Sequence, residues 1–112
     1  MKRHDTGETL RRTNDPPLLI LTSLAGGPKH GHALAKDVQS FAGVILGPGT
    51  LYGAITRLEE RGLIEPLDTV DRRRPYRITG AGSVALRDAI AEMRQIADVG
   101  ALRLRLAGRA SA

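Results

Sequence analysis

The residues whose type and spacing most directly indicate a binding function are three consecutive arginines, Arg72, Arg73 and Arg74. A guanidinium group forms paired hydrogen bonds with phosphate or carboxylate oxygens. Because only Asp68 and Asp71 lie nearby in the sequence, three adjacent arginines exceed the local carboxylates, and we interpret the cluster as a phosphate-binding site. The alternative is a set of surface ion pairs, each worth less than about 1 kcal/mol. The acidic partners for such pairs would be Glu59, Glu60 and Asp71.

A second group of small and polar residues spans residues 47–57. Glycines at 47, 49 and 53 would let the start of a helix approach phosphate groups closely. The free backbone amides at the start of a helix attract the negative charge of a phosphate. The hydroxyls of Thr50 and Tyr52 suit phosphates and base edges alike, and Arg57 lies two turns further along the same side. The residues that we assign to DNA binding are Gly49, Thr50, Tyr52, Gly53, Thr56, Arg57, Arg72, Arg73 and Arg74.

Other chemistries find little support. The pair His30 and His32 has a spacing at which helical residues do not face the same way, and the chain has no cysteine, so we expect no metal site. There is no phosphate loop ending in Lys-Ser/Thr and no nucleophile elbow, and adjacent Glu59 and Glu60 indicate a solvated helix face. We therefore expect no enzyme, no catalytic residue and no cofactor.

The length of 112 residues and 12.0 kDa fits one domain, whose core must be aliphatic because there are only two Tyr, one Phe and no Trp. The net charge of +5 is uneven: residues 1–14 carry +2, residues 68–77 carry +2 and residues 100–112 carry +3. Basic segments beside near-neutral ones are typical of nucleic-acid binders. Residues 1–17 lack the apolar run of a signal peptide, and no stretch of about 18 apolar residues occurs, so we expect a cytoplasmic protein without membrane contact.

Three helices are predicted in the first half of the chain. Asp15 as a capping carboxylate and Pro16 start the first, which ends at Gly26 and is apolar nearly all round. The second spans about residues 31–41 and the third about residues 49–61, with Gly47 as cap and Pro48 as first residue. Their inward stripes, at spacing i, i+4, i+7, are Leu34, Val38 and Phe41 and then Leu51, Ile55 and Leu58.

A hairpin and a last helix complete the pattern. Residues 63–67 and 74–79 have the period of short strands, which Pro66 and Pro75 confine to limited pairing. Thr79 can cap a helix that reaches about Val99, with a break at Gly100. Beyond the break, residues 101–112 either prolong the helix or fray. The apolar stripe of this helix exceeds what a lone helix needs, so it should meet either the first helix or a second copy of the chain. We assign it to dimerisation. The stripe comprises Leu86, Ile90, Met93 and Ala97.

The order helix, helix, helix, hairpin, helix predicts a mainly α (α+β) fold: a winged helix-turn-helix with a C-terminal dimerisation helix. In that fold the third helix enters the major groove and the hairpin, called the wing, lies along the backbone. We divide the chain into a flexible basic arm (1–14), a DNA-binding domain (15–79), a dimerisation helix (80–100) and a basic tail (101–112).

Four segments, at residues 27–34, 48–55, 57–64 and 71–79, resemble the PadR family of bacterial transcriptional regulators, a likeness that covers about residues 17–97. Its most specific part is Pro-Gly-Thr-Leu-Tyr at 48–52 followed by Arg-Arg-Pro-Tyr at 73–76. The resemblance implies DNA contacts at Thr50, Leu51, Tyr52, Arg57 and the wing arginines, although the spacing of Leu51 assigns that residue to the core. Two residues depart from the family pattern: His32 stands where an aromatic is common and Gly47 where a capping Ser is common.

The resemblance further implies a cytoplasmic homodimer that binds double-stranded DNA at an inverted repeat and acts mostly as a repressor. Some relatives respond to a small-molecule inducer, and Met93 is a residue that would line such a site, although packing explains it better. The sequence does not name an effector. The alternative is a dimeric winged-helix adaptor that binds another protein and uses its arginines only as a solvated surface.

Overall fold

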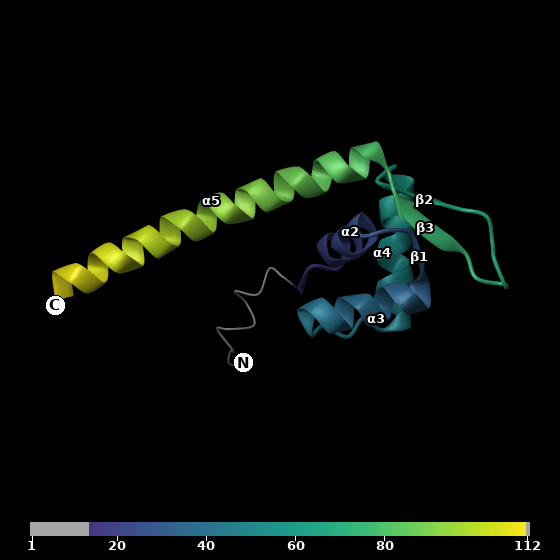
Figure 1. Cartoon of the computed structure of the whole chain (residues 1–112), viewed down its shortest axis with the longest axis horizontal. Helices are drawn as coiled ribbons and strands as arrows, with labels where there is room; N and C mark the ends of the chain where they lie inside the picture. The colour runs from purple at the N-terminus through teal and green to yellow at the C-terminus, as the bar shows by residue number, and fades with distance from the viewer. Residues whose placement is uncertain (1–13, 112) are drawn as a thin grey trace.

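The computed structural model describes residues 14–111, so the arm predicted for residues 1–14 lies outside the described residues except for its last position. Three helices form a bundle, a small sheet packs beside them, and a long helix projects away (Figure 1). The elements in chain order are α2 (Pro16–Ala25), β1 (Lys29–His30), α3 (Gly31–Ala42), α4 (Pro48–Glu60), β2 (Ile64–Pro66), β3 (Pro75–Ile78) and α5 (Gly80–Ser111).

The first three helices begin and end close to the predicted positions. Gly47 is the N-cap of α4 and Pro48 its first residue, as expected. Asp15 is the N-cap of α2, but its carboxylate makes no capping hydrogen bond, so that part of the prediction is wrong. The physical reason is that Pro16 and Pro17 have no N–H, which removes donors that a capping side chain would otherwise accept from.

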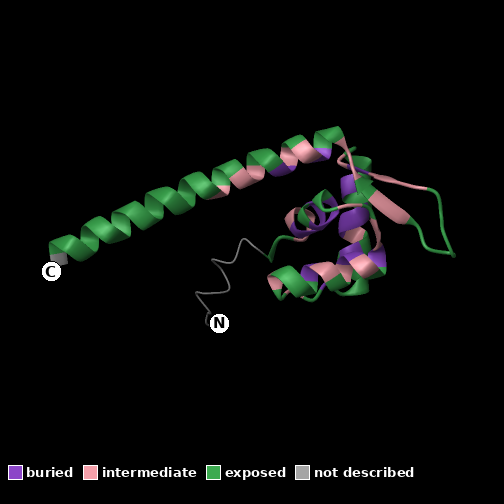
Figure 2. Ribbon diagram, viewed as in Figure 1, coloured by how far each residue is buried: buried purple, intermediate pink, exposed green. Residues whose placement is uncertain are grey.

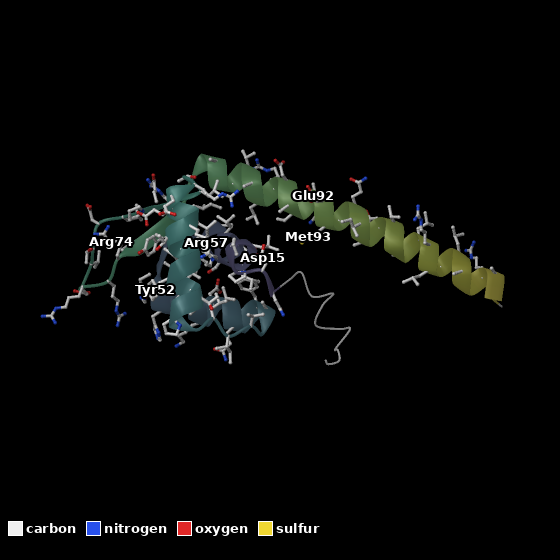
Figure 3. All side chains as sticks on the ribbon, turned by 180° about the vertical axis from the view of Figure 1, so that it is seen from behind. Asp15, Tyr52, Arg57, Arg74, Glu92 and Met93 are labelled. Atoms are coloured by element: carbon white, nitrogen blue, oxygen red, sulfur yellow. The ribbon has the colours of Figure 1, made fainter. Side chains whose placement is uncertain are left out.

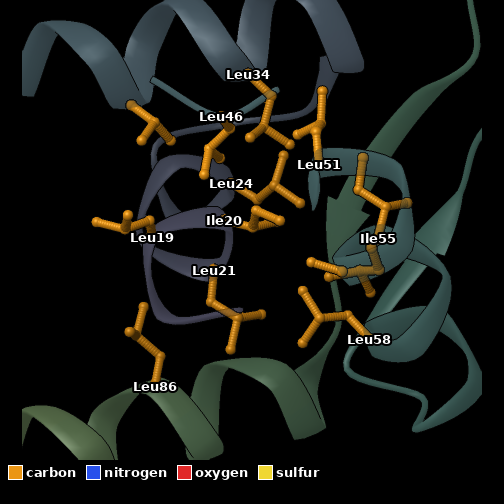
Figure 4. Packing of buried hydrophobic residues seen from close by; sticks show 13 residues of the cluster. Leu19, Ile20, Leu21, Leu24, Leu34, Leu46, Leu51, Ile55, Leu58 and Leu86 are labelled. Carbon is orange, nitrogen blue, oxygen red and sulfur yellow. The ribbon is translucent and has the colours of Figure 1, made fainter. Parts of the chain in front are cut away.

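The core is centred on α2, which contacts α3, α4 and α5. Its predicted burial on most sides is confirmed, because Leu19, Ile20, Leu21 and Leu24 are all buried (Figure 4). The inward stripe of α4 meets them with Leu51, Ile55 and Leu58, while α3 contributes Leu34 and Val38. The cluster is almost entirely aliphatic, as the composition requires.

Phe41 was expected in this core, and that expectation is wrong. Its side chain is 47% exposed, although it continues the stripe of Leu34 and Val38 at helical spacing. The core closes at Val38, and Phe41 in the last turn of α3 borders a shallow apolar depression instead. The other residues that line this depression are Leu18, Leu19, Thr22, Ala42 and Met93.

The sheet has three strands in the order β1-β3-β2, all antiparallel. The predicted hairpin of β2 and β3 is present, with Glu65 opposite Arg77, and these two side chains form an ion pair. The two-residue strand β1 was not predicted. It pairs Lys29 with Tyr76 and His30 with Pro75, and so it fixes the start of α3 against the base of the wing.

Helix α5 is one continuous helix of 32 residues, about 48 Å long at the usual rise per residue. Thr79 caps the start of α5 and ties it to the end of α4. Its hydroxyl accepts a hydrogen bond from the Gly82 amide (3.0 Å) and donates one to the Gly62 carbonyl (2.7 Å). The predicted break at Gly100 is wrong, and residues 101–111 prolong the helix, which is one of the two outcomes expected for them. No helix within residues 14–111 has both the length and the apolar content to cross a membrane.

The predicted dimerisation stripe on α5 lies partly in the chain's own core. Leu86 is buried and Ile90 packs against the core cluster, because the first turns of α5 lie on α2. Met93 is half-buried and Ala97 is exposed. Figure 2 shows that α5 becomes fully exposed where it projects beyond the helical bundle. The stripe therefore begins as an intramolecular contact and continues as an open surface.

Candidate nucleic-acid interface

Helix α4 presents one side to the core and the other to solvent. Leu51 is only 4% exposed, which confirms its assignment to the core. The polar residues predicted for contact occupy the opposite side, and all but half-buried Gly53 are exposed. Figure 3 shows Tyr52 and Arg57 along α4, with Arg74 on the wing beside it. The exposed residues of this surface are Gly49, Thr50, Tyr52, Thr56 and Arg57.

Two contacts within α4 set what these side chains can offer. The Thr56 hydroxyl donates to the Tyr52 carbonyl at 2.9 Å, so Thr56 presents an acceptor and its methyl group to an approaching ligand. A β-carbon placed on Gly53 would lie 3.6 Å from Nη1 of Arg57. The guanidinium group therefore lies back along the helix, beside Gly53.

The wing is closed by a two-residue turn. The amide of Val70 donates to the Arg73 carbonyl at 2.8 Å, and the amide of Arg73 donates to the Val70 carbonyl at 2.9 Å. The two central residues, Asp71 and Arg72, have positive φ angles of 50° and 65°. Positive φ at both central positions is the geometry of a type I′ turn, which normally carries Asn or Asp followed by Gly. Arg72 therefore occupies a position that favours glycine.

Replacing Arg72 with glycine should stabilise the protein by about 1 kcal/mol, because a left-handed conformation costs a non-glycine residue roughly that much. A thermal melt would show the gain as a rise in melting temperature of several degrees. Asp71→Gly is the matched control and should gain less, since aspartate tolerates this conformation better. A fall in the melting temperature of Arg72→Gly would show that the side chain itself stabilises the turn.

The wing and the start of α4 meet at one pocket, beside the first turn of α3. Among the described residues, no aspartate or glutamate side chain lines it. The ion pairs within residues 14–111 are Lys29–Asp37 and Arg77–Glu65, so none of them involves a wing arginine (Arg72, Arg73 or Arg74). The structure therefore does not support the alternative in which these arginines form surface ion pairs with Glu59, Glu60 or Asp71. The residues that line this pocket, here called the wing pocket, are His30, Gly31, His32, Tyr52, Arg72, Arg73, Arg74 and Tyr76.

Two tyrosines supply hydroxyl groups to the wing pocket. Tyr52 lies against the backbone of Gly31, where a β-carbon would overlap the Tyr52 hydroxyl and come 2.8 Å from its Cζ. Burial, followed by the charge of Glu59, raises the pKa of Tyr76 above its ordinary value, although Arg74 acts in the opposite direction. A raised pKa keeps the Tyr76 phenol protonated, so it is a hydrogen-bond donor near neutral pH.

His30 belongs to this surface and was not predicted to. It is the N-cap of α3, with Nδ1 accepting a hydrogen bond from the Ala33 amide at 3.3 Å, and Nη1 of Arg73 lies 3.4 Å from its Nε2. Its ring is parallel to that of His32, with centroids 6.4 Å apart. Within residues 14–111 no group of three metal-ligating side chains is present. Strand β1, which brings His30 to the wing, is too short for its alternation to be visible in the sequence.

Comparison with known proteins decides the family. The model of the PadR-like family of transcriptional regulators matches residues 20–88, which include the second half of α2, all of α3 and α4, and both strands of the wing. The chain belongs to this family. A PadR family transcription regulator from Clostridium difficile R20291 has a similar structure, with a TM-score of 0.68 and 28% identity over 74% of this chain and 91% of that one. The winged-helix DNA-binding protein F93 from STIV shares the fold, with a TM-score of 0.65 and 16% identity over 70% of this chain and 87% of that one.

Two curated relatives of this PadR-like chain are much longer than it is. An uncharacterized 37.1 kDa protein in transposon TN4556 of Streptomyces fradiae is 48% identical over 71 residues. The transcriptional activator GvpE2 of Halobacterium salinarum is 34% identical over 67 residues. The aligned regions are 63% and 60% of this chain but only 21% and 34% of those relatives, so the likeness concerns only a part of each relative.

Proposed function

We propose that this PadR-like regulator binds double-stranded DNA with α4 in the major groove and the wing arginines on the phosphate backbone. The observation that carries the proposal is the wing pocket, where α4 and the wing present hydroxyl and guanidinium groups side by side with no carboxylate among the described residues that line it. Phosphate contacts position such a protein, and side chains on α4 read base edges. Thr50, Tyr52 and Arg57 are the exposed α4 side chains that would do so.

We further propose a cytoplasmic homodimer that binds an inverted repeat and represses by occluding a promoter. Support for the dimer comes from α5, which exposes large apolar side chains after it leaves the body, among them Ile96 (67% exposed) and Leu104 (76% exposed). Exposed apolar surface of this kind marks an interaction site. Two copies would place their α4 helices in successive major grooves about 34 Å apart.

Replacing Ala97 with aspartate should convert the dimer into monomers, because it buries a carboxylate in an apolar interface without touching the chain's own core. Sedimentation velocity would report the change in mass, and circular dichroism should show unchanged helix content. Ala97 is a better test position than Ile90, which packs against the core. Ala91→Asp, an exposed position on the charged side of α5, is the matched control and should remain dimeric. A dimeric Ala97→Asp variant would contradict the predicted surface.

Selection of bound duplexes from a random pool tests the proposed function. We expect an enriched sequence with two inverted half-sites whose centres are about one helical turn apart. A reporter gene downstream of that sequence should be repressed when the protein is present. Absence of any enriched duplex would contradict DNA binding, and activation of the reporter would contradict repression by occlusion.

A further inference from the structure

Two hydrogen-bond donors face each other at the edge of the wing pocket. The Ala33 amide donates to Nδ1 of His30, so in the neutral ring the hydrogen is carried by Nε2. Nη1 of Arg73 lies 3.4 Å from that Nε2, and a guanidinium group has no acceptor. With this tautomer the pair cannot form a hydrogen bond with each other, and within residues 14–111 neither N–H group has another protein acceptor. An oxygen atom placed beside them could accept from both.

The surroundings favour an anion as the source of that oxygen. Arg72 and Arg74 add two positive charges to the pocket, and the hydroxyl of Tyr52 lies at its floor against Gly31. No acidic side chain lines the wing pocket among the described residues. Asp71 lines a neighbouring depression that His30 and Arg73 also line, but the ion pairs within residues 14–111 do not join it to Arg73. A group with two neighbouring oxygens, each accepting from one donor, matches this arrangement.

We propose that the wing pocket holds one phosphate group of the DNA backbone, with His30 and Arg73 donating to its two non-bridging oxygens. This inference rests on the proposed DNA binding and adds His30, the cap of α3, to the contact surface. Strand β1 is what makes the site: its pairing with β3 places His30 beside the wing. A free phosphate ion offers the same oxygens, so the experiment must distinguish the two sources.

A double-mutant cycle on duplex binding tests whether the two residues hold the same phosphate. His30→Asn removes the imidazole ring. Asparagine is among the most favourable residues at a helix N-cap, so α3 should stay folded. We expect about fivefold weaker binding for His30→Asn, about tenfold for Arg73→Gln, and about tenfold to twentyfold for the double variant. The control Arg87→Gln removes one exposed charge from α5 and should have a smaller effect.

The cycle has clear contrary outcomes. Effects that multiply to about fiftyfold in the double variant would mean independent contacts and would overturn the shared site. No loss of affinity in His30→Asn would do the same, while the proposed DNA binding by the wild-type protein would stand. If the wild-type protein binds no duplex, the proposed function fails, and titration with inorganic phosphate decides whether the anion site exists.

Inorganic phosphate provides that second arm, followed through the NMR signals of the His30 ring. We expect a saturable shift in the wild-type protein and none in Arg73→Gln. Addition of excess duplex should abolish the response, because the backbone phosphate would occupy the pocket. A phosphate response that persists on the DNA complex would assign the pocket to a free ligand and overturn the backbone assignment. Absence of any response to phosphate would overturn the anion site.

Discussion

Replacing Gly82 with alanine is expected to destabilise the protein by about 2–3 kcal/mol, although alanine favours helices by about 1 kcal/mol over glycine. A β-carbon at this position would overlap the Leu63 carbonyl oxygen and come 2.8 Å from Cγ1 of Ile78. The Leu63 oxygen belongs to the backbone and already accepts a hydrogen bond from the Thr79 amide at 3.1 Å. Room for the methyl group can therefore come only from moving α5 away from the sheet.

A thermal melt of Gly82→Ala should show a midpoint roughly 10–20 °C lower than that of the wild-type protein. The matched control is Gly100→Ala in the same helix, where a β-carbon would have no neighbour within 4 Å. That variant should gain about 0.5–1 kcal/mol from helix propensity alone. Equal or higher stability of Gly82→Ala would mean that α5 does not pack on the Leu63 segment as described.

Converting Arg72, Arg73 and Arg74 together to glutamine is expected to weaken duplex binding by roughly 100-fold or more. Each arginine would lose a charge-assisted hydrogen bond to phosphate, and such a bond contributes about 1.5–3 kcal/mol. The three losses are not additive, because neighbouring arginines contact the same stretch of backbone. The wing lies outside the core, so the melting temperature should change little. Fluorescence anisotropy with a selected duplex measures the affinity.

The control for this triple variant removes the same total charge from another surface. Arg87, Arg94 and Arg109 are exposed on α5, away from the wing, and their replacement by glutamine should reduce affinity far less. Equal losses in the two triple variants would show that only the net charge matters, and would contradict the placement of the wing on the backbone.

Local patterns in the sequence predicted most of this fold. The prolines and glycines that flank the first three helices, together with leucines at helical spacing, fixed their bounds to within about a residue and placed Leu51 inside. Phe41 shows the limit of periodicity, because spacing identifies a helix face but cannot tell where the neighbouring elements stop covering it. At Gly100, a single glycine costs a helix only about 1 kcal/mol, and the long run of Ala, Leu and Arg around it outweighs that cost.

The site was only partly predictable for a different reason. The residue type alone predicted a binding role for Arg72, Arg73 and Arg74. The position of Tyr52 on α4 predicted its role. His30 and Gly31 matter because a two-residue strand pairs with the wing, and such pairing joins residues more than 40 positions apart. Leu86 was assigned to a partner subunit because the sequence alone cannot distinguish a contact with α2 from a contact with a second copy.

The salt dependence of duplex binding by the wild-type protein tests the central claim most directly. The three wing arginines of each protomer should release counterions. The logarithm of the binding constant should therefore fall with the logarithm of salt concentration with a slope of about −3 or, for a dimer, steeper. Between 50 and 200 mM NaCl the affinity for a selected duplex should then drop by about 50-fold or more. A slope near zero would contradict binding of the DNA backbone by this surface.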